Sequence, residues 1–308
     1  MQQALEIIKT PLLQASLWKE PLFFAAEELS PEDKEYLYEH FFCSESFQNA
    51  LEGQGFLIDS SAEILVMVNI EDHLQFQLVD YSGDYQKAWA RLSNLEEELG
   101  QTLNYAFSER FGYLTSLPTQ SGTGLHVHAL LHVAALVHTQ QLKNALNTIK
   151  DDTVTITELL GNEEEHLADY LLLSNRYCLG IDERKIINTV YSFAIKLMEA
   201  EKTARTHLSK LESTHLKNLV SRAYGLLAHS YQLEAKETLG ALSLIKLGID
   251  LNWISGISDS KLNELLLLCR RGHLLLHSHL NDLDAEEVNK KRAELMQGEL
   301  KAIALYHL

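Results

Sequence analysis

Apolar positions near the start of the chain follow two different spacings. Residues 63–80, EILVMVNIEDHLQFQLVD, hold two short runs of β-forming residues around a polar centre, which predicts a β-hairpin. Residues 85–107 predict an amphipathic helix, because four leucines share one stripe: Leu92, Leu95, Leu99 and Leu103. The segment from Leu125 to Val137 fits either a strand or a helix by its spacing alone.

The second half of the chain has the pattern of a helical protein. All four prolines lie in the first 118 residues, and the remaining 190 contain none. A long helix is predicted from Asp182 to about Glu201, and an earlier one starts at Ser30. Two more helices are predicted in the tail from about residue 259, one starting near Ser258 and one capped by Asp284.

The charge of the chain limits its partners. The formal net charge is −17 at pH 7, which opposes binding to nucleic acid and to anionic membranes, so we expect neither as a partner. The same charge disfavours the binding of ATP.

The composition and the amino terminus are typical of a cytoplasmic protein. The segment MQQALEIIKT has no basic stretch followed by an apolar run, and no stretch of about 18 apolar residues offers a membrane span. The cysteines are odd in number and widely separated, as expected of reduced thiols: Cys43, Cys178 and Cys269. We expect a cytoplasmic location.

The segment SGTGLHVHALLH, residues 121–132, contains the most informative chemistry. Gly122 and Gly124 indicate a turn that lets a polyphosphate approach the backbone, but histidines follow where an arginine would serve better. Three of them alternate as neighbours on one strand face and so resemble zinc ligands: His126, His128 and His132. No cysteine or carboxylate stands at ligand spacing, so we expect solvated or hydrogen-bonded histidines and no metal.

Three segments together resemble the phosphagen (ATP:guanido) kinase superfamily, and within it the bacterial protein-arginine kinases. VNIEDHLQ, residues 68–75, is similar to the family pattern V-N-E-E-D-H-L-R. Residues 111–139 are similar to F-G-Y-L-T-S-C-P-T-N-x-G-T-G-L-R followed by an apolar strand. Residues 161–180, GNEEEHLADYLLLSNRYCLG, are similar to the family's flexible loop and the strand behind it. These members transfer the γ-phosphoryl group of ATP to a guanidinium group.

The resemblance implies an α+β fold, in which helices flank an antiparallel sheet of the guanidino-kinase, glutamine-synthetase-like type. It implies a small helical amino-terminal region over residues 1–60, an α+β catalytic domain over 61–257 and a helical carboxy-terminal domain over 258–308. We expect the hairpin and a strand near residues 126–133 to share one antiparallel sheet, and the carboxy-terminal helices to form a homodimer.

Phosphagen kinases neutralise the ATP phosphates with a cage of arginines, whose planar forks match phosphate oxygens two at a time. By the resemblance, Gln75, His126 and Thr157 stand at three of those arginine positions. The other two belong to an S-x-R-x-R motif, and residues 1–90 contain no arginine. The resemblance therefore implies that the ATP-binding charges are lost.

The positions around the guanidinium substrate are changed as well. Glu71 matches the family's catalytic carboxylate and is retained. Leu117 replaces a reactive cysteine, Gln120 replaces an asparagine, and Asn162 replaces a loop glutamate. We interpret the chain as a degenerate pseudoenzyme that acts as a binding or regulatory scaffold and needs no cofactor. The alternative is an active protein-arginine kinase that uses MgATP at a site rebuilt around Glu71 and the histidines.

Two further segments bear on partners. In VNKKRAEL, residues 288–295, Arg292 and Ala293 match the family's phosphoarginine-sensing pattern R-D-x-x-R-A, but the first two positions do not. We interpret this segment as an exposed helix, and the acidic run Glu163–Glu165 as a solvated loop. By analogy with the family, the partner is an activator protein or a component of stress-response proteolysis.

Overall fold

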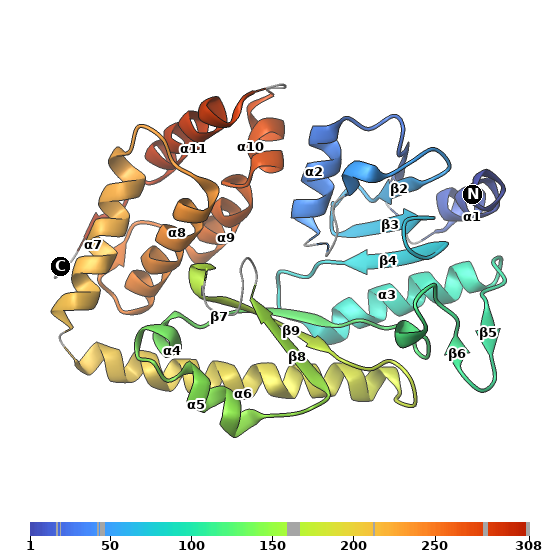
Figure 1. Ribbon diagram of the computed structural model, residues 1–308, viewed down its shortest axis with the longest axis horizontal. Coiled ribbons are helices and arrows are strands. Elements are labelled where there is room, and N and C mark those ends of the chain that lie inside the picture. The colour runs from blue at the N-terminus through green and yellow to red at the C-terminus, as the bar shows by residue number, and fades with distance from the viewer. Residues whose placement is uncertain are drawn as a thin grey trace. The chain divides into compact units, whose positions relative to one another are not determined.

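The computed structural model describes residues 1–16, 18, 20–41, 43, 47–158, 167–211, 213–279 and 283–305. The chain divides into two compact units, Met1–Gly124 and Leu125–Leu308 (Figure 1). Two predicted features, Asn162 and the acidic run Glu163–Glu165, lie outside the described residues.

The first unit is built on a four-stranded antiparallel sheet with helices on both faces. Its strands pair in chain order: β1 (Leu22–Ala25), β2 (Gly55–Ile58), β3 (Ile64–Val68) and β4 (Leu74–Leu78). The alternation of β3 sends Val66 and Val68 to one hydrophobic cluster, with α1 (Gln2–Gln14) and α3 (Tyr85–Gly100). Leu65 and Met67 point to the opposite face of the sheet and pack in a second hydrophobic cluster with α2 (Pro31–His40). The predicted hairpin is confirmed as β3 and β4.

The helices of the first unit begin where the caps predict but end earlier in one case. Ser30 caps α2 in a capping box with Asp33. The helix predicted over residues 85–107 ends at Gly100, and Leu103 still packs in the core beyond it. The first 60 residues contribute β1 and β2 to the sheet in addition to the helices predicted there. The remaining elements are short: η1 (Phe47–Asn49), β5 (Phe107–Ser108), β6 (Gly112–Tyr113) and η2 (Pro118–Gln120).

The second unit contains its own antiparallel sheet, in the order β7–β9–β8. The strands are β7 (His128–His132), β9 (Tyr170–Asn175) and β8 (Val154–Glu158), preceded or joined by α4 (Ala134–His138), α5 (Leu142–Ile149) and η3 (Leu167–Asp169). The segment that fitted either a strand or a helix thus forms both, β7 and then α4. One face of this sheet packs against α6 (Glu183–Lys210), capped by Asp182 as predicted.

The prediction that the hairpin and β7 share one sheet is wrong for the described part of the chain. β4 pairs with β3, whereas β7 pairs with β9, about 40 residues farther along the chain. Local spacing predicts each strand but carries no information on such a distant partner, which is why the sheet order was missed.

The remainder of the second unit is helical. It contains α7 (Thr214–His229), α8 (Ala235–Asp250), α9 (Asp259–Leu268), α10 (Arg271–Ser278), α11 (Ala285–Glu299), and the short strands β10 (Ile254–Ser255) and β11 (Ala304–Leu305). Ser258 and Asp284 cap α9 and α11 as predicted, but α10 lies between them, so the tail has three described helices rather than two. Among the described residues, no helix is long and apolar enough to cross a membrane.

The α+β fold class is confirmed by these antiparallel sheets, their flanking helices and the helical carboxy-terminal part. The predicted domain boundaries at residues 60 and 257 stay predictions.

A buried carboxylate ties α6 to the start of α4. Glu201, 3% exposed, accepts hydrogen bonds from the backbone N–H groups of Ala135 and Leu136, at 3.0 and 2.9 Å. Its charge is balanced by the Arg205 guanidinium, whose Nε lies 2.8 Å from the carboxylate. Because α4 has no side-chain cap of its own, Glu201 satisfies donors that would otherwise be buried without an acceptor.

We expect Glu201→Gln to lower the free energy of unfolding by about 1 to 3 kcal/mol, because an amide has one oxygen to accept the two backbone N–H groups and cannot pair with Arg205, which keeps its ion pair with Asp250. Urea denaturation measures the change. Glu199→Gln, an exposed carboxylate on the same helix, is the matched control and should stay within about 0.5 kcal/mol of the parent. Equal stability of the two variants would contradict this role for Glu201.

A second buried network joins the sheet to α8. The Ser243 hydroxyl donates to Asp169 Oδ2 at 2.6 Å, so its oxygen accepts from His132 Nε2 at 2.9 Å. His132 Nδ1 is buried and has no hydrogen-bond partner among the described residues. Burial lowers the pKa of His132 to about 3, despite the opposing effect of Asp169. His132 is therefore neutral in the folded protein.

This depressed pKa has a definite sign for stability. Below the unfolded pKa of about 6.5 the unfolded chain binds a proton at His132 that the folded chain does not, so stability falls as the pH is lowered. We expect the wild type to lose about 2 kcal/mol more than His132→Gln between pH 7 and pH 5. Denaturation at both pH values measures the difference, and His215→Gln, an exposed site, is the control. Identical losses in wild type and His132→Gln would refute the assignment.

Candidate functional site

The turn between β3 and β4 is held by Asn69, which allows Glu71 to stand exposed. Asn69 adopts a left-handed conformation with φ 59°, and its Nδ2 donates to the carbonyls of Met1 and Gly53. Its Oδ1 lies 3.1 Å from His73 Nδ1. Asp72 accepts a 2.5 Å hydrogen bond from the Ser116 backbone N–H and so ties this turn to the loop after β6. Asp72 and His73 therefore order the turn, and Glu71 lies exposed between them and Asn69.

Glu71 and Gln75 lie on the same hairpin. Gln75 is half-buried on β4, opposite Met67 of β3. The pKa of the Cys43 thiol is raised to about 12. Burial is the larger cause, and the carboxylate of Glu71 is the second. A thiol with that pKa stays protonated near neutral pH, so Cys43 is not a nucleophile here.

Backbone packing explains why glycine stands at the positions of this turn. Gly122 exchanges backbone hydrogen bonds with Tyr113, and a Cβ on Gly112 would lie 2.3 Å from the Gly122 carbonyl oxygen. Gly112, Gly122 and Gly124 all have positive φ angles, of 72°, 128° and 64°. The Gly122 N–H donates to the Tyr113 carbonyl, so this amide is already satisfied and is not presented to a phosphate.

The two substituted positions in the following loop differ in exposure. Leu117 is 49% exposed, and its carbonyl accepts a hydrogen bond from the Thr115 hydroxyl. Gln120 lies in η2 and is half-buried. Leu117 carries no sulfur, whereas Gln120 keeps a side-chain amide on a longer side chain.

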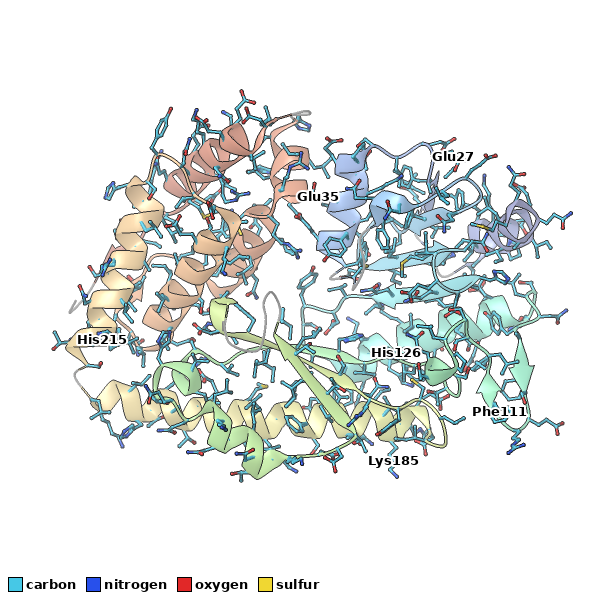
Figure 2. All side chains as sticks on the ribbon, viewed as in Figure 1. Glu27, Glu35, Phe111, His126, Lys185 and His215 are labelled. Carbon is cyan, nitrogen blue, oxygen red and sulfur yellow. The ribbon has the colours of Figure 1, made fainter. Side chains whose placement is uncertain are left out.

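In the second unit, Asn175 orders the segment that carries His126. The Asn175 side chain accepts from the Val127 N–H at 2.7 Å and donates to the Leu125 carbonyl at 3.0 Å. His126 itself is exposed (Figure 2), and its Nε2 lies 3.6 Å from the Sγ of buried Cys178. Burial raises the pKa of the Cys178 thiol, which is consistent with a packed, unreactive sulfur.

The three strands of the second sheet have two different faces. Alternate residues such as Leu171 and Leu173 are buried on the side of α6. The opposite face carries eight residues in register, of which His132 and Tyr170 are packed near Ser243 of α8. We call the rest of it the open face: His128, Leu130, Leu172, Ser174, Thr155 and Thr157. None of the residues on the open face is a lysine or an arginine.

The predicted phosphate positions do not meet on this open face. Thr157 pairs with Leu172, which pairs in turn with Leu130, so Thr157 lies two strands across from Leu130. His126 lies four residues before Leu130, which on an extended chain is about 13 Å. The two side chains therefore do not form a pair around one phosphate group.

The three histidines each have a different partner in the structure, so they do not form a set of zinc ligands. His132 is bonded to Ser243 and His128 to Ser174 at 2.7 Å, whereas His126 precedes the strand beside Cys178. Among the described residues, no group of three histidines, cysteines or carboxylates is placed to hold a metal ion.

One cation near the site was missed from the sequence. Arg176 follows β9 directly, and the β7–β9 register continued by one residue beyond the Asn175–Val127 hydrogen bond places Arg176 opposite His126. Arg176 is exposed, and its guanidinium lies 5.6 Å from the Tyr177 ring centroid. The signal was the SNRYCLG segment, in which Asn175 and Arg176 stand together at a strand end.

The carboxy-terminal arginine is structural. The segment around Arg292 was interpreted as an exposed helix, but Arg292 is 2% exposed. Its guanidinium donates to the carbonyls of Cys269 and Leu233 and to Asn289 Oδ1, which joins α11 to two loops. Buried guanidinium groups need such acceptors, and these leave Arg292 no exposed fork for a phosphoryl group.

The three cysteines are free, as predicted, with Cys178 and Cys269 buried. The arrangement as a whole offers a carboxylate on one hairpin, a packed glycine turn and a nearly neutral open face. Among the described residues of the second unit, the open face carries no lysine or arginine, the side chains that bind a triphosphate.

Solved structures share this fold. The crystal structure of lombricine kinase matches with a TM-score of 0.57 and 18% identity, over 67% of this chain and 60% of that one. The duplicated taurocyamine kinase from Schistosoma mansoni, with bound transition state analog components, matches with a TM-score of 0.56 and 21% identity, over 77% of this chain and 34% of that one. At these identities the likeness concerns the fold alone.

Sequence relatives and family models cover most of the chain. Protein-arginine kinases of Halothermothrix orenii and Chlamydia pneumoniae are 33% and 34% identical, over 90% and 97% of this chain and 79% and 80% of theirs. The model for the ATP:guanido phosphotransferase C-terminal catalytic domain matches residues 7–204, and the model for the protein-arginine kinase McsB C-terminal domain matches residues 213–306. The chain therefore belongs to the ATP:guanido phosphotransferase family, as a homologue of the McsB-type protein-arginine kinases.

Proposed function

We propose that this chain is a catalytically degenerate protein-arginine kinase homologue that acts as a binding or regulatory scaffold. The observation that carries the proposal is the absence of lysine and arginine from the open face of β7, β9 and β8 in the described residues. The hairpin of β3 and β4 likewise contains no arginine, and Gln75 occupies its family position.

The energetic cost of these losses is large. Removing one preorganised, charge-assisted contact from a transition state costs about 2 to 4 kcal/mol. Several such losses together remove most of the rate enhancement, because phosphoryl transfer depends mainly on positioning and charge neutralisation. A carboxylate such as Glu71 has little to activate when no nucleotide is held beside it.

The scaffold would act through proteins. By analogy with the family, the partner is an activator protein or a component of stress-response proteolysis, and the carboxy-terminal helices form a homodimer in the cytoplasm. A net charge of −17 favours neither nucleic acid nor an anionic membrane as the partner.

One observation favours a second candidate function, an active protein-arginine kinase. Glu71 is exposed, and Arg176 is an exposed cation placed by register opposite His126. In that case Arg176 would contact MgATP, and Glu71 would accept a proton from the attacking guanidinium of an arginine side chain. Its signature is transfer of the γ-phosphoryl group of radiolabelled MgATP to arginines of an unfolded test protein.

The transfer assay separates the two functions. The scaffold function predicts no transfer above the rate without protein. Transfer by the wild type that Glu71→Gln abolishes, and that Glu27→Gln at another exposed position does not, would establish the active kinase instead.

We expect the variant Gln75→Arg/His126→Arg/Thr157→Arg to regain ATP binding but not phosphoryl transfer. Three bidentate donors return to the family positions, whereas the amino-terminal arginine pair, Leu117 and Asn162 remain unrepaired. His126→Arg should be tolerated in folding because His126 is exposed. The measurement is the shift of the melting temperature with millimolar MgATP, expected to be several degrees for the variant and none for the wild type.

The matched control is Gln75→Arg/His128→Arg/Thr155→Arg, which adds the same charges at neighbouring positions of the same segments. Equal shifts in both triple variants would show that charge alone, and not the family position, causes binding. Unfolding of His126→Arg by itself would show that His126 is a packing residue and would contradict the proposed register.

A further inference from the structure

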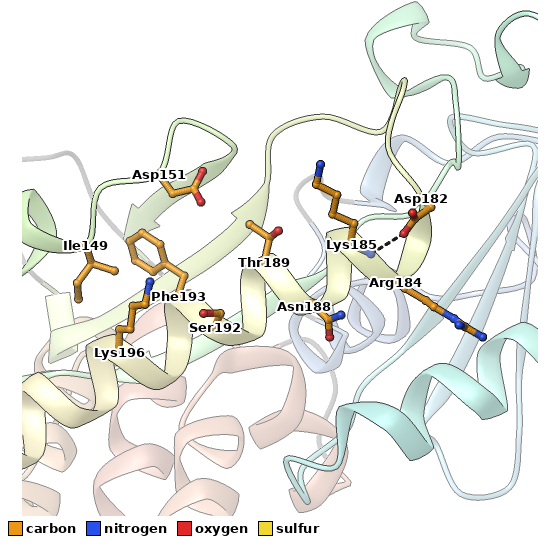
Figure 3. Close-up of a pocket in the computed structure, with 10 residues that line it drawn as sticks. All are labelled: Ile149, Asp151, Asp182, Arg184, Lys185, Asn188, Thr189, Ser192, Phe193 and Lys196. Carbon is orange, nitrogen blue, oxygen red and sulfur yellow. Dashed lines mark hydrogen bonds between the residues drawn. The ribbon is translucent and has the colours of Figure 1, made fainter.

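The outer surface of α6 carries a groove that the catalytic positions do not use. The groove has a volume of about 420 Å³ and lies along the first half of the helix, beside the end of α5 and the loop before β8 (Figure 3). Most of its lining comes from successive turns of α6, with Ile149 and Asp151 opposite: Asp182, Arg184, Lys185, Asn188, Thr189, Ser192, Phe193 and Lys196.

The groove is locally cationic on a strongly acidic protein. Arg184 and Lys185 stand on the first turn of α6, and Lys196 stands about three turns farther on. None of these three side chains forms a salt bridge or hydrogen bond with another described residue. All three are exposed, so they are available to a ligand.

The two carboxylates of the groove are already engaged. Asp182 Oδ1 accepts the Lys185 backbone N–H at 2.7 Å as the cap of α6. Asp151 Oδ1 accepts from the Thr153 hydroxyl and from the Thr153 N–H at 2.5 and 2.9 Å, and these bonds lower its pKa. Their oxygens are therefore partly used within the chain. The nearby Lys196 ammonium also lowers the pKa of Asp151, although the two groups form no ion pair.

The spacing of the charges indicates the shape of the ligand. Arg184 and Lys196 are 12 residues apart on one helix, so their Cα atoms are about 18 Å apart. A single phosphate cannot reach both ends, but an extended peptide of about six residues can. Asn188, Thr189 and Ser192 lie between the ends and can hydrogen-bond to the backbone of such a peptide.

We propose that this groove binds an extended acidic segment of a partner protein, with one carboxylate near Arg184 and Lys185 and a second near Lys196. Ile149 lies beside Lys196 at that end of the groove (Figure 3) and contacts the apolar part of the segment. The inference rests on the proposed scaffold function, since it names the chemistry of the partner. Because the net charge of −17 repels acidic chains at long range, binding requires this local cluster.

The test uses the full chain and two fluorescein-labelled six-residue peptides, followed by fluorescence anisotropy. One peptide carries glutamate at both ends, and the other carries glutamine there. We expect the glutamate peptide to bind at least about tenfold more tightly than the glutamine peptide. Lys185→Glu and Lys196→Glu should each weaken its binding by about tenfold or more.

Lys202→Glu is the matched control, because Lys202 is an exposed lysine on α6 beyond the groove and its reversal changes the net charge equally. It should leave peptide binding within about twofold of the wild type. Equal weakening by all three variants, or equal binding of both peptides, would overturn the proposal. Absence of peptide binding together with absence of phosphoryl transfer would reject the groove while leaving the scaffold function standing.

Discussion

Burial of one face of the β7–β9–β8 sheet against α6 is the constraint on which the second unit depends. Leu171 and Leu173 pack there with Phe193 and Leu197 of α6, all nearly inaccessible to solvent. Adjacent strand residues point to opposite faces, so the open face can change its side chains while the packed face keeps its own. The fold and the charges of the site are therefore under separate constraints. With this separation, a chain can keep the family fold while the charges of the open face change.

The buried polar groups give the same unit its internal order. Glu201 supplies the acceptor for the start of α4, and Ser243 links Asp169 to His132 at the end of the sheet. The first network joins α6 to α4, and the second joins α8 to β7 and to the residue before β9. The second network lies at the end of the same sheet face that carries His128 and Leu130, where His132 contacts Tyr170 and Ser243. The exposed positions of that face take no part in either network, so their side chains can change without disturbing it.

The helix starts could be predicted from the sequence, because they depend on local chemistry. Ser30, Asp182, Ser258 and Asp284 each cap the helix that they predict, because a cap is set by residues within one turn. The partner of β7 was not predictable in this way, since β9 is far away along the chain. The exposure of Arg292 was also misjudged, because its acceptors are carbonyls brought together only by the fold.

The candidate site shows the same limit. The resemblance to the family predicts site positions at Glu71, Gln75, His126 and Thr157, but it does not predict the role of Asn175 in ordering the segment before β7. Arg176 was overlooked because its relation to His126 follows from strand register and not from sequence spacing. Such pairings require the structure.

The central claim is that this fold no longer holds a nucleotide, and calorimetric titration of the wild-type chain with MgATP tests it most directly. The account predicts no saturable heat up to about 1 mM MgATP, because the open face offers no fork of donors to the phosphates. A saturable isotherm with a dissociation constant in the micromolar range would contradict it, and would mean that Arg176 and the histidines replace the missing arginines.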